Sequence, residues 1–379
     1  MLQSILRAGF AAFARVQRQP QHVWRAAWAV MSCRTAALGA HRLQCPQGHV
    51  SILRMNSCGH RACPQCWYAR MLEWLENCSR TVLPVAHFHV VFTCPSAFNE
   101  LWRWNRRRLA KLLFRCVRET LLEMLAGDRH LGAQPGVIAA LHTWGRTLSF
   151  HPHVHCVVSA GGLDPHGAWR ACPNGFLLPG RAVRVVFAGK FLSGLERLWK
   201  SGALTLPPRL HDDDMRQLLI AQAAQKWNVH IDAPVGGPRG VIGYLARYLR
   251  GGPVKNHRLL RFDSDVVALR YRRAGDPTAT DNVLTLPINE FIRRWADHVP
   301  VPGLHMVRRW GLYAARNAAQ LAVARSLLPP PAEKASHDAH PALPSLPERT
   351  CPVCHIPLVV VDVVPRPGSP PRREAFAAA

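Results

Sequence analysis

Short runs of apolar and β-branched residues, bounded by Gly, Pro, Asn or Asp, mark the strands that this chain is expected to form. Within most of these runs apolar and polar positions alternate, which is the period of a strand with one buried face. The runs that fit this description are residues 85–93, 137–148, 151–158, 226–231, 266–273 and 282–286. The second and third runs are close enough to pair as an antiparallel hairpin, and so are the last two.

Apolar residues that recur every three or four positions predict helices between these strands. A long helix is expected over 97–126, with Ser96 as its cap and Gly127 as its stop. Three successive carboxylates at 212–214 favour the start of a helix over 215–225, because negative charge stabilises a helix N-terminus. Further helices are expected within 1–40 (one or two), over 71–80, 287–296 and 311–328, whereas 161–200 is expected to be irregular with basic strands.

The excess of positive charge predicts that this globular protein binds a polyanion. Lys and Arg number 48 against 23 Asp and Glu, a formal net charge of +25, and nucleic acid is the commonest polyanion that offsets such an excess. A membrane surface is the alternative. However, the chain has no uninterrupted apolar run of about 18 residues, and Arg7 and Arg15 break up the apolar N-terminal stretch. We therefore expect DNA as the partner and no membrane, and the twelve cysteines, which cluster at metal-ligand spacings, favour a reducing cytoplasm.

The cysteines cluster at spacings typical of metal ligands. Cys63 and Cys66 form a CxxC knuckle, in which two thiolates can turn onto one tetrahedral zinc ion. The favoured ligand set is Cys45, Cys58, Cys63 and Cys66, with His49 and His60 as alternates, and buried thiols without metal are the plainer possibility. Four protein ligands leave no open position, so the zinc would be structural.

A second CxxC pair lies near the C-terminal end of the sequence, at Cys351 and Cys354. It is half a zinc site, which His337 and His340 could complete. The surrounding residues are rich in Pro and favour a mobile linker instead.

Three histidines alternate along the run 151–158, so His151, His153 and His155 share one face of a strand. Two imidazoles two residues apart on a rigid strand can hold one divalent cation. The ordinary alternative is that they only make hydrogen bonds. His87 and His89 have the same spacing without the flanking glycines, and we expect them to pack or to support the site.

Two tyrosines, Tyr244 and Tyr248, stand four residues apart in a stretch with helical character. At this spacing they are neighbours on one helix face, either as a packed aromatic pair or as reactive groups. The positive charge around them is unusual for a buried helix. The residues expected to contact DNA here are Arg247, Arg250, Lys255, Arg258 and Arg261.

Four strings carry a family resemblance when taken together. They are Leu141-His142-Thr143-Trp144-Gly145, His151-Pro152-His153-Val154-His155, Tyr244-Leu245-Ala246-Arg247-Tyr248 and Asn256-His257-Arg258-Leu259. They resemble the HUH endonucleases and, within them, the two-tyrosine transposases of rolling-circle insertion sequences, the insertion sequence 91 family. This family also has a cysteine-rich N-terminal domain. The second cysteine that often follows the first closely in related transposases is missing after Cys45, which leaves the ligand set open.

The resemblance implies an α/β (α+β) fold with an HUH-type antiparallel-sheet nuclease domain, flanking helices and a small N-terminal zinc-binding domain. We expect the helical N-terminus and zinc-binding domain over 1–80, the catalytic and DNA-binding domain over 81–328, and a linker with a flexible tail over 329–379.

The resemblance also implies a chemistry. His153 and His155 would bind a divalent catalytic metal, Mg²⁺ or Mn²⁺, with Asn256 as a candidate third ligand and His151 as its rival. Tyr244 and Tyr248 would attack single-stranded DNA at the element ends and flanking target, forming 5′-phosphotyrosine intermediates that rejoin without ATP. A plasmid replication initiator or relaxase with the same nicking chemistry, and a non-catalytic zinc DNA-binding protein, are the alternatives.

Overall fold

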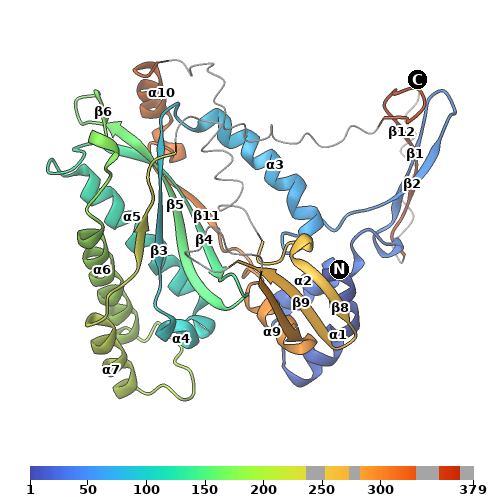
Figure 1. Ribbon diagram of the computed structural model, residues 1–379, viewed down its shortest axis with the longest axis horizontal. Coiled ribbons are helices and arrows are strands. Elements are labelled where there is room, and N and C mark those ends of the chain that lie inside the picture. The colour runs from blue at the N-terminus through green and yellow to red at the C-terminus, as the bar shows by residue number, and fades with distance from the viewer. Residues whose placement is uncertain (236–251, 273–281, 330–349, 368–379) are drawn as a thin grey trace. The chain divides into compact units, whose positions relative to one another are not determined.

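The computed structural model describes residues 1–235, 252–272, 282–329 and 350–367 (Figure 1). Contacts group the chain into two units. The first comprises Met1–Leu72, Val254–Val299 and Leu343–Ala379, and the second comprises Glu73–Pro253 and Pro300–Ala342. Both units are discontinuous in sequence, so they do not follow the expected segments 1–80, 81–328 and 329–379 one to one. None of the described helices is both long and apolar enough to cross a membrane.

The described part of the second unit is built on a six-stranded antiparallel sheet. Five strands lie in the order β11-β4-β5-β3-β7, and β6 pairs with β5. Their bounds are β3 (His87–Thr93), β4 (Gln134–Trp144), β5 (Phe150–Leu163), β6 (Trp169–Ala171), β7 (Val229–Ile231) and β11 (Val307–Gly311). The hairpin expected between the runs 137–148 and 151–158 is confirmed, because β4 and β5 pair antiparallel.

Helices cover one face of this sheet, as α5, α6 and α7 show in Figure 1. The described helices of this unit are α4 (Asn99–Trp104), α5 (Arg106–Ala126), α6 (Gly180–Lys200), α7 (Asp212–Ala223) and α10 (Ala318–Ser326). Every second residue of the central strands packs into the core between sheet and helices, among them Phe88, Val90, Val154, Cys156 and Leu141. The alternation that predicted the strands therefore assigns the remaining positions, including the histidines, to the opposite face.

The expected helix over 97–126 is interrupted at Asn105, which is a correction. The Asn105 side chain is buried and donates from Nδ2 to the carbonyl oxygen of Thr205 at 2.7 Å, while its Oδ1 accepts from the Thr205 amide at 2.9 Å. This side chain ties the break to a segment a hundred residues away, which no local pattern contains.

The expectation of an irregular segment over 161–200 is also wrong, because α6 occupies its second half. Val183, Phe187, Phe191 and Leu195 recur every four residues and are fully buried. Basic and glycine residues between them obscured this stripe in the sequence. The helix expected over 311–328 is shorter than predicted, since α10 begins at Ala318 after β11 and a 3-10 turn.

The first unit combines helices with two small sheets. Its described elements are α1 (Leu2–Val16), α2 (Gln21–Ser32), β1 (Ala40–Gln44), β2 (Ser51–Met55), β8 (Leu259–Asp263), β9 (Val266–Tyr271), β10 (Asn282–Pro287), α9 (Ile288–Asp297) and β12 (Val359–Val364). The strands form the sheets β12-β1-β2 and β10-β9-β8, and the β9–β10 pairing confirms the second expected hairpin. α3 (Pro64–Thr81) contains the boundary between the two units.

The core of the first unit forms where α1 meets α2 and α9. The Phe10 ring lies edge-on to Trp24, with centroids 4.9 Å apart, and edge-on to Trp295 at 6.4 Å. Gly9 allows this close approach, because a Cβ there would lie 2.6 Å from Cδ1 of Ile288. A substitution at Gly9 would thus require the side chains of Ile288 and Ile292 to move.

Candidate metal centres and active site

Three buried histidines converge on the face of the second unit's sheet that lies opposite the core between sheet and helices. His153 and His155 project from β5, and His142 stands directly opposite His153 on the neighbouring strand β4. One ring nitrogen from each of the three lies within 4.8 Å of the others. Directly opposed residues of an antiparallel pair have adjacent side chains, so the strand register itself assembles this cluster.

The spacing of the histidine nitrogens fits a shared metal ion. Nε2 of His153 lies 2.9 Å from Nε2 of His155. Two imidazole nitrogens bound at about 2.1 Å and at a right angle would lie about 3.0 Å apart. Burial lowers the pKa of His153 to about 4 and that of His155 well below its ordinary value, so both rings are neutral at neutral pH. Neutral imidazole is the form that binds metals.

Hydrogen bonds fix where the protons of these rings sit. Nδ1 of His89 donates to the Asp232 carboxylate at 2.6 Å, so Nε2 of His89 accepts. Nδ1 of His155 donates to that nitrogen at 2.8 Å, which leaves Nε2 of His155 with a lone pair. Nδ1 of His153 donates to the carbonyl oxygen of His151 at 2.6 Å, which leaves its Nε2 with a lone pair as well. The two lone pairs face each other, and a cation is what relieves that repulsion.

The sheet positions Asp232 at the end of the row of hydrogen bonds that runs from His155 through His89. It follows β7, and its amide donates to the carbonyl oxygen of His89 at 2.9 Å. Burial raises the pKa of its carboxyl, but hydrogen bonds from His89 and His230 outweigh this and the net pKa is lowered. The carboxylate is therefore ionised and fixes the orientation of the His89 ring.

His142 is the member of the cluster that sequence reasoning missed. It lies in the string Leu141–Gly145 that carries part of the family resemblance, but it has no histidine two residues away to mark it as a ligand. The signal was the predicted β4–β5 hairpin, since its register places position 142 beside position 153. His151, the expected rival ligand, contributes its backbone carbonyl to His153, and its ring is outside the group of three.

Asn256, the other candidate third ligand, belongs to the first unit. There it lines a small cavity with Cys33 and Cys63. Its Oδ1 is buried and has no hydrogen-bond partner within the described parts of the chain. The structure thus brings His142, and not Asn256, into one unit with His153 and His155.

The residues expected to attack and contact DNA are only partly described. Tyr244, Tyr248, Arg247 and Arg250 lie outside the described residues. Arg258 donates from Nε to the carbonyl oxygen of Arg270 at 3.0 Å, and burial lowers the pKa of Lys255. Arg261 is exposed on β8 beside Asp263.

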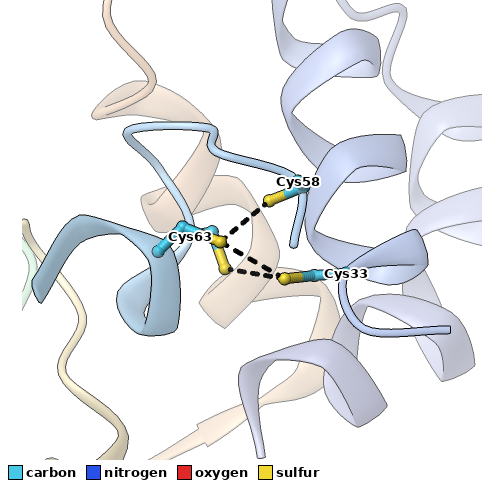
Figure 2. Close-up of side chains that lie close together, drawn as sticks. Cys33, Cys58 and Cys63 are labelled. Carbon is cyan, nitrogen blue, oxygen red and sulfur yellow. Dashed lines mark hydrogen bonds between the residues drawn. The ribbon is translucent and has the colours of Figure 1, made fainter. Parts of the chain in front are cut away.

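Four cysteine sulfurs meet in the first unit, as Figure 2 shows for Cys33, Cys58 and Cys63. Cys66 lies 3.4 Å from Cys33 and 3.5 Å from Cys58, and Cys63 lies 3.7 Å from Cys33. Sulfurs bound to one tetrahedral zinc at about 2.3 Å would be about 3.8 Å apart. Cys33 directly follows α2, and Cys63 and Cys66 lie at the start of α3.

The electrostatics of these thiols favour a metal. Hydrogen bonds from Cys58 and Cys63 lower the pKa of Cys66, while hydrogen bonding to its neighbours raises the pKa of Cys58. One thiolate thus forms readily, and a second negative charge beside it requires a compensating cation.

The predicted zinc set needs one correction: Cys33 occupies the place given to Cys45. Cys33 has no cysteine close to it in sequence, so no spacing rule marks it. Cys45 lies instead with His49, Cys351 and Cys354. His60, the other alternate, accepts a hydrogen bond from the Ala62 amide at Nδ1.

Comparisons with known proteins agree with this arrangement. A family model described as "Putative transposase" matches residues 136–320, and one described as "Transposase zinc-binding domain" matches residues 5–94. The first span contains the histidine cluster, and the second contains the four cysteines. The fold and its two sites therefore define a transposase with a zinc-binding domain.

Two relatives narrow this class. The chain is 37% identical over 362 residues to "Putative transposase y4qJ" of Sinorhizobium fredii, covering 91% of this chain and 90% of that protein. It is 32% identical over 302 residues to the "Transposase for insertion sequence element IS801" of Pseudomonas savastanoi pv. phaseolicola, covering 77% of this chain and 70% of that protein. The chain belongs to the insertion sequence 91 family of transposases.

A solved structure of the conjugative relaxase TrwC, complexed with a 27-mer DNA comprising the recognition hairpin and the cleavage site, is also similar. The identity is 14% and the TM-score 0.25, over 63% of this chain and 73% of that one.

Proposed function

We propose that this transposase nicks and rejoins single DNA strands through 5′-phosphotyrosine intermediates in rolling-circle transposition. The observation that carries the proposal is the close approach of Nε2 of His153 and Nε2 of His155, 2.9 Å apart, in a buried cluster with His142. The net charge of +25 and the relatives named as transposases support DNA as the substrate.

His142, His153 and His155 would hold the catalytic cation, Mg²⁺ or Mn²⁺. When bound, the cation would polarise the scissile phosphate and stabilise its developing negative charge. The role of the protein residues is to keep the three rings neutral, buried and in one orientation. Asp232 and His89 do this for His155, and the carbonyl of His151 does it for His153.

The nucleophile would be the hydroxyl of Tyr244 or Tyr248. The phenol oxygen forms a bond to phosphorus and loses its proton to solvent, while the bond from phosphorus to the 3′ oxygen breaks and that oxygen gains a proton. The phosphotyrosyl link keeps the energy of the broken diester, so a free 3′-hydroxyl can later displace the tyrosine without ATP. A second tyrosine allows a second transfer before the first end is released.

We also propose that Cys33, Cys58, Cys63 and Cys66 hold the structural zinc of the N-terminal domain. The support is the set of sulfur separations, between 3.4 and 3.7 Å, and the matched zinc-binding family. All four positions around this zinc are filled by protein, so it would shape the domain and take no part in chemistry.

The test of the function is incubation of the full chain with single-stranded oligonucleotides from the two ends of its element. We expect site-specific nicks and a covalent protein–DNA adduct that survives denaturation. Both should be lost when divalent cations are chelated, and both should return when Mn²⁺ or Mg²⁺ is added back. Oligonucleotides of scrambled sequence are the control. Cleavage without any covalent adduct would overturn the tyrosine mechanism.

A further inference from the structure

The C-terminal cysteine pair meets an N-terminal pair of ligands within the first unit. Sγ of Cys45 lies 3.5 Å from Sγ of Cys354 and 3.7 Å from Nδ1 of His49, and Sγ of Cys351 lies 3.9 Å from the same nitrogen. Three sulfurs and one nitrogen around a tetrahedral zinc would show sulfur–sulfur separations of about 3.8 Å and sulfur–nitrogen separations of about 3.6 Å. The observed distances agree with a Cys₃His site.

The local backbone on both sides has the form that such a site needs. Between Cys45 and His49 the chain turns at Gly48, which has φ of 80° and donates its amide to the carbonyl oxygen of Cys45. This left-handed conformation is favourable for glycine and brings the side chain of His49 back toward Cys45. In the second loop the Val353 amide points at Sγ of Cys351 at 3.4 Å, so that sulfur is prepared to carry negative charge.

The site lies where two paired strands meet their loops. Gln44, the last residue of β1, is paired with Val359, the first residue of β12. Cys45 directly follows Gln44, and Cys354 lies five residues before Val359. A metal at this point would therefore join segments more than three hundred residues apart at the end of their strand pairing.

The described side-chain contacts of strand β12 contribute little to its pairing with β1. All six of its residues are exposed, so its pairing with β1 buries little apolar surface. The ion pair between Arg42 and Asp362 spans 3.7 Å with both side chains about half exposed, and such pairs contribute little. A bound metal is the strongest available source of stability for this pairing, since binding energy at a structural site is folding energy.

We propose that Cys45, His49, Cys351 and Cys354 bind a second structural zinc ion, which fastens the C-terminal strand β12 to the N-terminal hairpin. This site is separate from the Cys33, Cys58, Cys63 and Cys66 cluster and independent of the nicking chemistry. A disulfide between Cys45 and Cys354 is the rival arrangement of the same thiols.

The first test is the zinc content of the full chain, purified under reducing conditions and measured by elemental analysis. We expect the double variant Cys351→Ser, Cys354→Ser to lose one zinc per chain, and Cys58→Ser, Cys63→Ser to lose a different one, so that the losses add. Cys172→Ser, a cysteine outside both clusters, is the matched control and should lose none. An unchanged zinc content in the first double variant, or a Cys45–Cys354 disulfide in the unmutated protein, would overturn the proposal.

A second test keeps the metal in place, so it remains valid even if the serine variants fail to fold. With cobalt in place of zinc, changing His49→Cys should keep the metal and shift the visible spectrum of one site from three-sulfur to four-sulfur ligation. His355→Asn is the matched control, because His355 is in the same loop with φ of 60°, which Asn tolerates, and is not a ligand. A spectrum that changes with His355→Asn and not with His49→Cys would contradict the assigned ligands.

Hydrogen exchange then reports on the strand itself. In the zinc-loaded protein the amides of β12 and of its partner β1 should be protected, and the variant lacking Cys351 and Cys354 should lose this protection at β12 while α5 is unaffected. Equal protection in both proteins would mean that zinc does not fasten β12.

Discussion

Nε2 of His89 accepts a hydrogen bond from Nδ1 of His155 at 2.8 Å, and the two ring planes are inclined to each other by only 7°. The two residues lie diagonally on paired strands, since His89 is opposite Val157 and His155 is opposite Val91. Because Asp232 holds the other nitrogen of His89, this single contact decides that Nε2 of His155 is free of a proton. A carboxylate outside the cluster thus sets the tautomer of a residue inside it.

The first prediction follows from that relationship. Asp232→Asn removes the charge that fixes His89, so His155 should present a protonated Nε2 more often. We expect the metal concentration for half-maximal nicking to rise by about 10–100-fold, the range typical of lost supporting groups. Excess Mn²⁺ should restore much of the rate. Asp263→Asn, at an exposed ion pair, is the control. A rate that falls without any change in metal dependence would refute this role.

The second prediction distinguishes the two candidate third ligands near His153. His142→Ala should weaken metal binding more than the loss of a supporting group does, beyond about 10–100-fold. His151→Ala should have a smaller effect, because His151 orients His153 through its backbone carbonyl, which the substitution keeps. Isothermal titration with Mn²⁺ measures both affinities. If the order is reversed, His151 and not His142 completes the site.

The third prediction concerns the tyrosines. Tyr→Phe removes only a hydroxyl, so a merely packed pair should lose about 0.5–1.5 kcal/mol of stability for each hydrogen bond broken. We expect the double variant Tyr244→Phe, Tyr248→Phe to fold and bind DNA but to form no covalent adduct, as measured on a denaturing gel. Tyr271→Phe is the matched control and should form adduct normally.

The single tyrosine variants should be unequal. One tyrosine is expected to make the first cut and the other to serve the second transfer, so one single variant should still nick while neither completes transposition. The arginines beside Tyr248 make it our choice for the first cut. Adduct formation at the unmutated rate in the double variant would place the nucleophile elsewhere.

The fourth prediction is a loss of stability in acid caused by His87. Its Nδ1 donates to the carbonyl oxygen of Val85, and its Nε2 accepts from the hydroxyl of Tyr313 at 2.6 Å. Burial lowers the pKa of His87 from 6.5 to about 4, so the unfolded chain binds this proton more readily than the folded one. The contribution is therefore complete above pH 6.5 and is lost as the pH falls toward 4, by up to about 3 kcal/mol.

Urea unfolding at pH values between 7 and 4 measures this effect. The variant His87→Gln should be less stable at pH 7 but should show a flatter decline of the unfolding free energy with falling pH. The difference between the two proteins isolates His87 from the other buried histidines. Parallel curves for the two proteins would show that His87 does not titrate as described.

Local patterns in the sequence were enough to predict the elements with a strong period and the residues that share their faces. The alternation along 151–158 placed His153 and His155 side by side, and the hairpin expected with 137–148 formed. Both follow from local physics, because a strand's two-residue period and a short connection are written in neighbouring residues.

The distant residues that complete each site became identifiable only from the packing of the folded chain. The fold divides these cysteines into two groups. It places Cys33 beside the CxxC knuckle that begins at Cys63, and it places Cys351 beside Cys45. The β3–β5 and β3–β7 pairings, and not any motif, brought His89 and Asp232 to His155. A spacing rule relates only residues that are a few positions apart in the sequence. A metal ion or a hydrogen bond needs ligand atoms that are close in space, and folding can bring these together from any distance in the sequence.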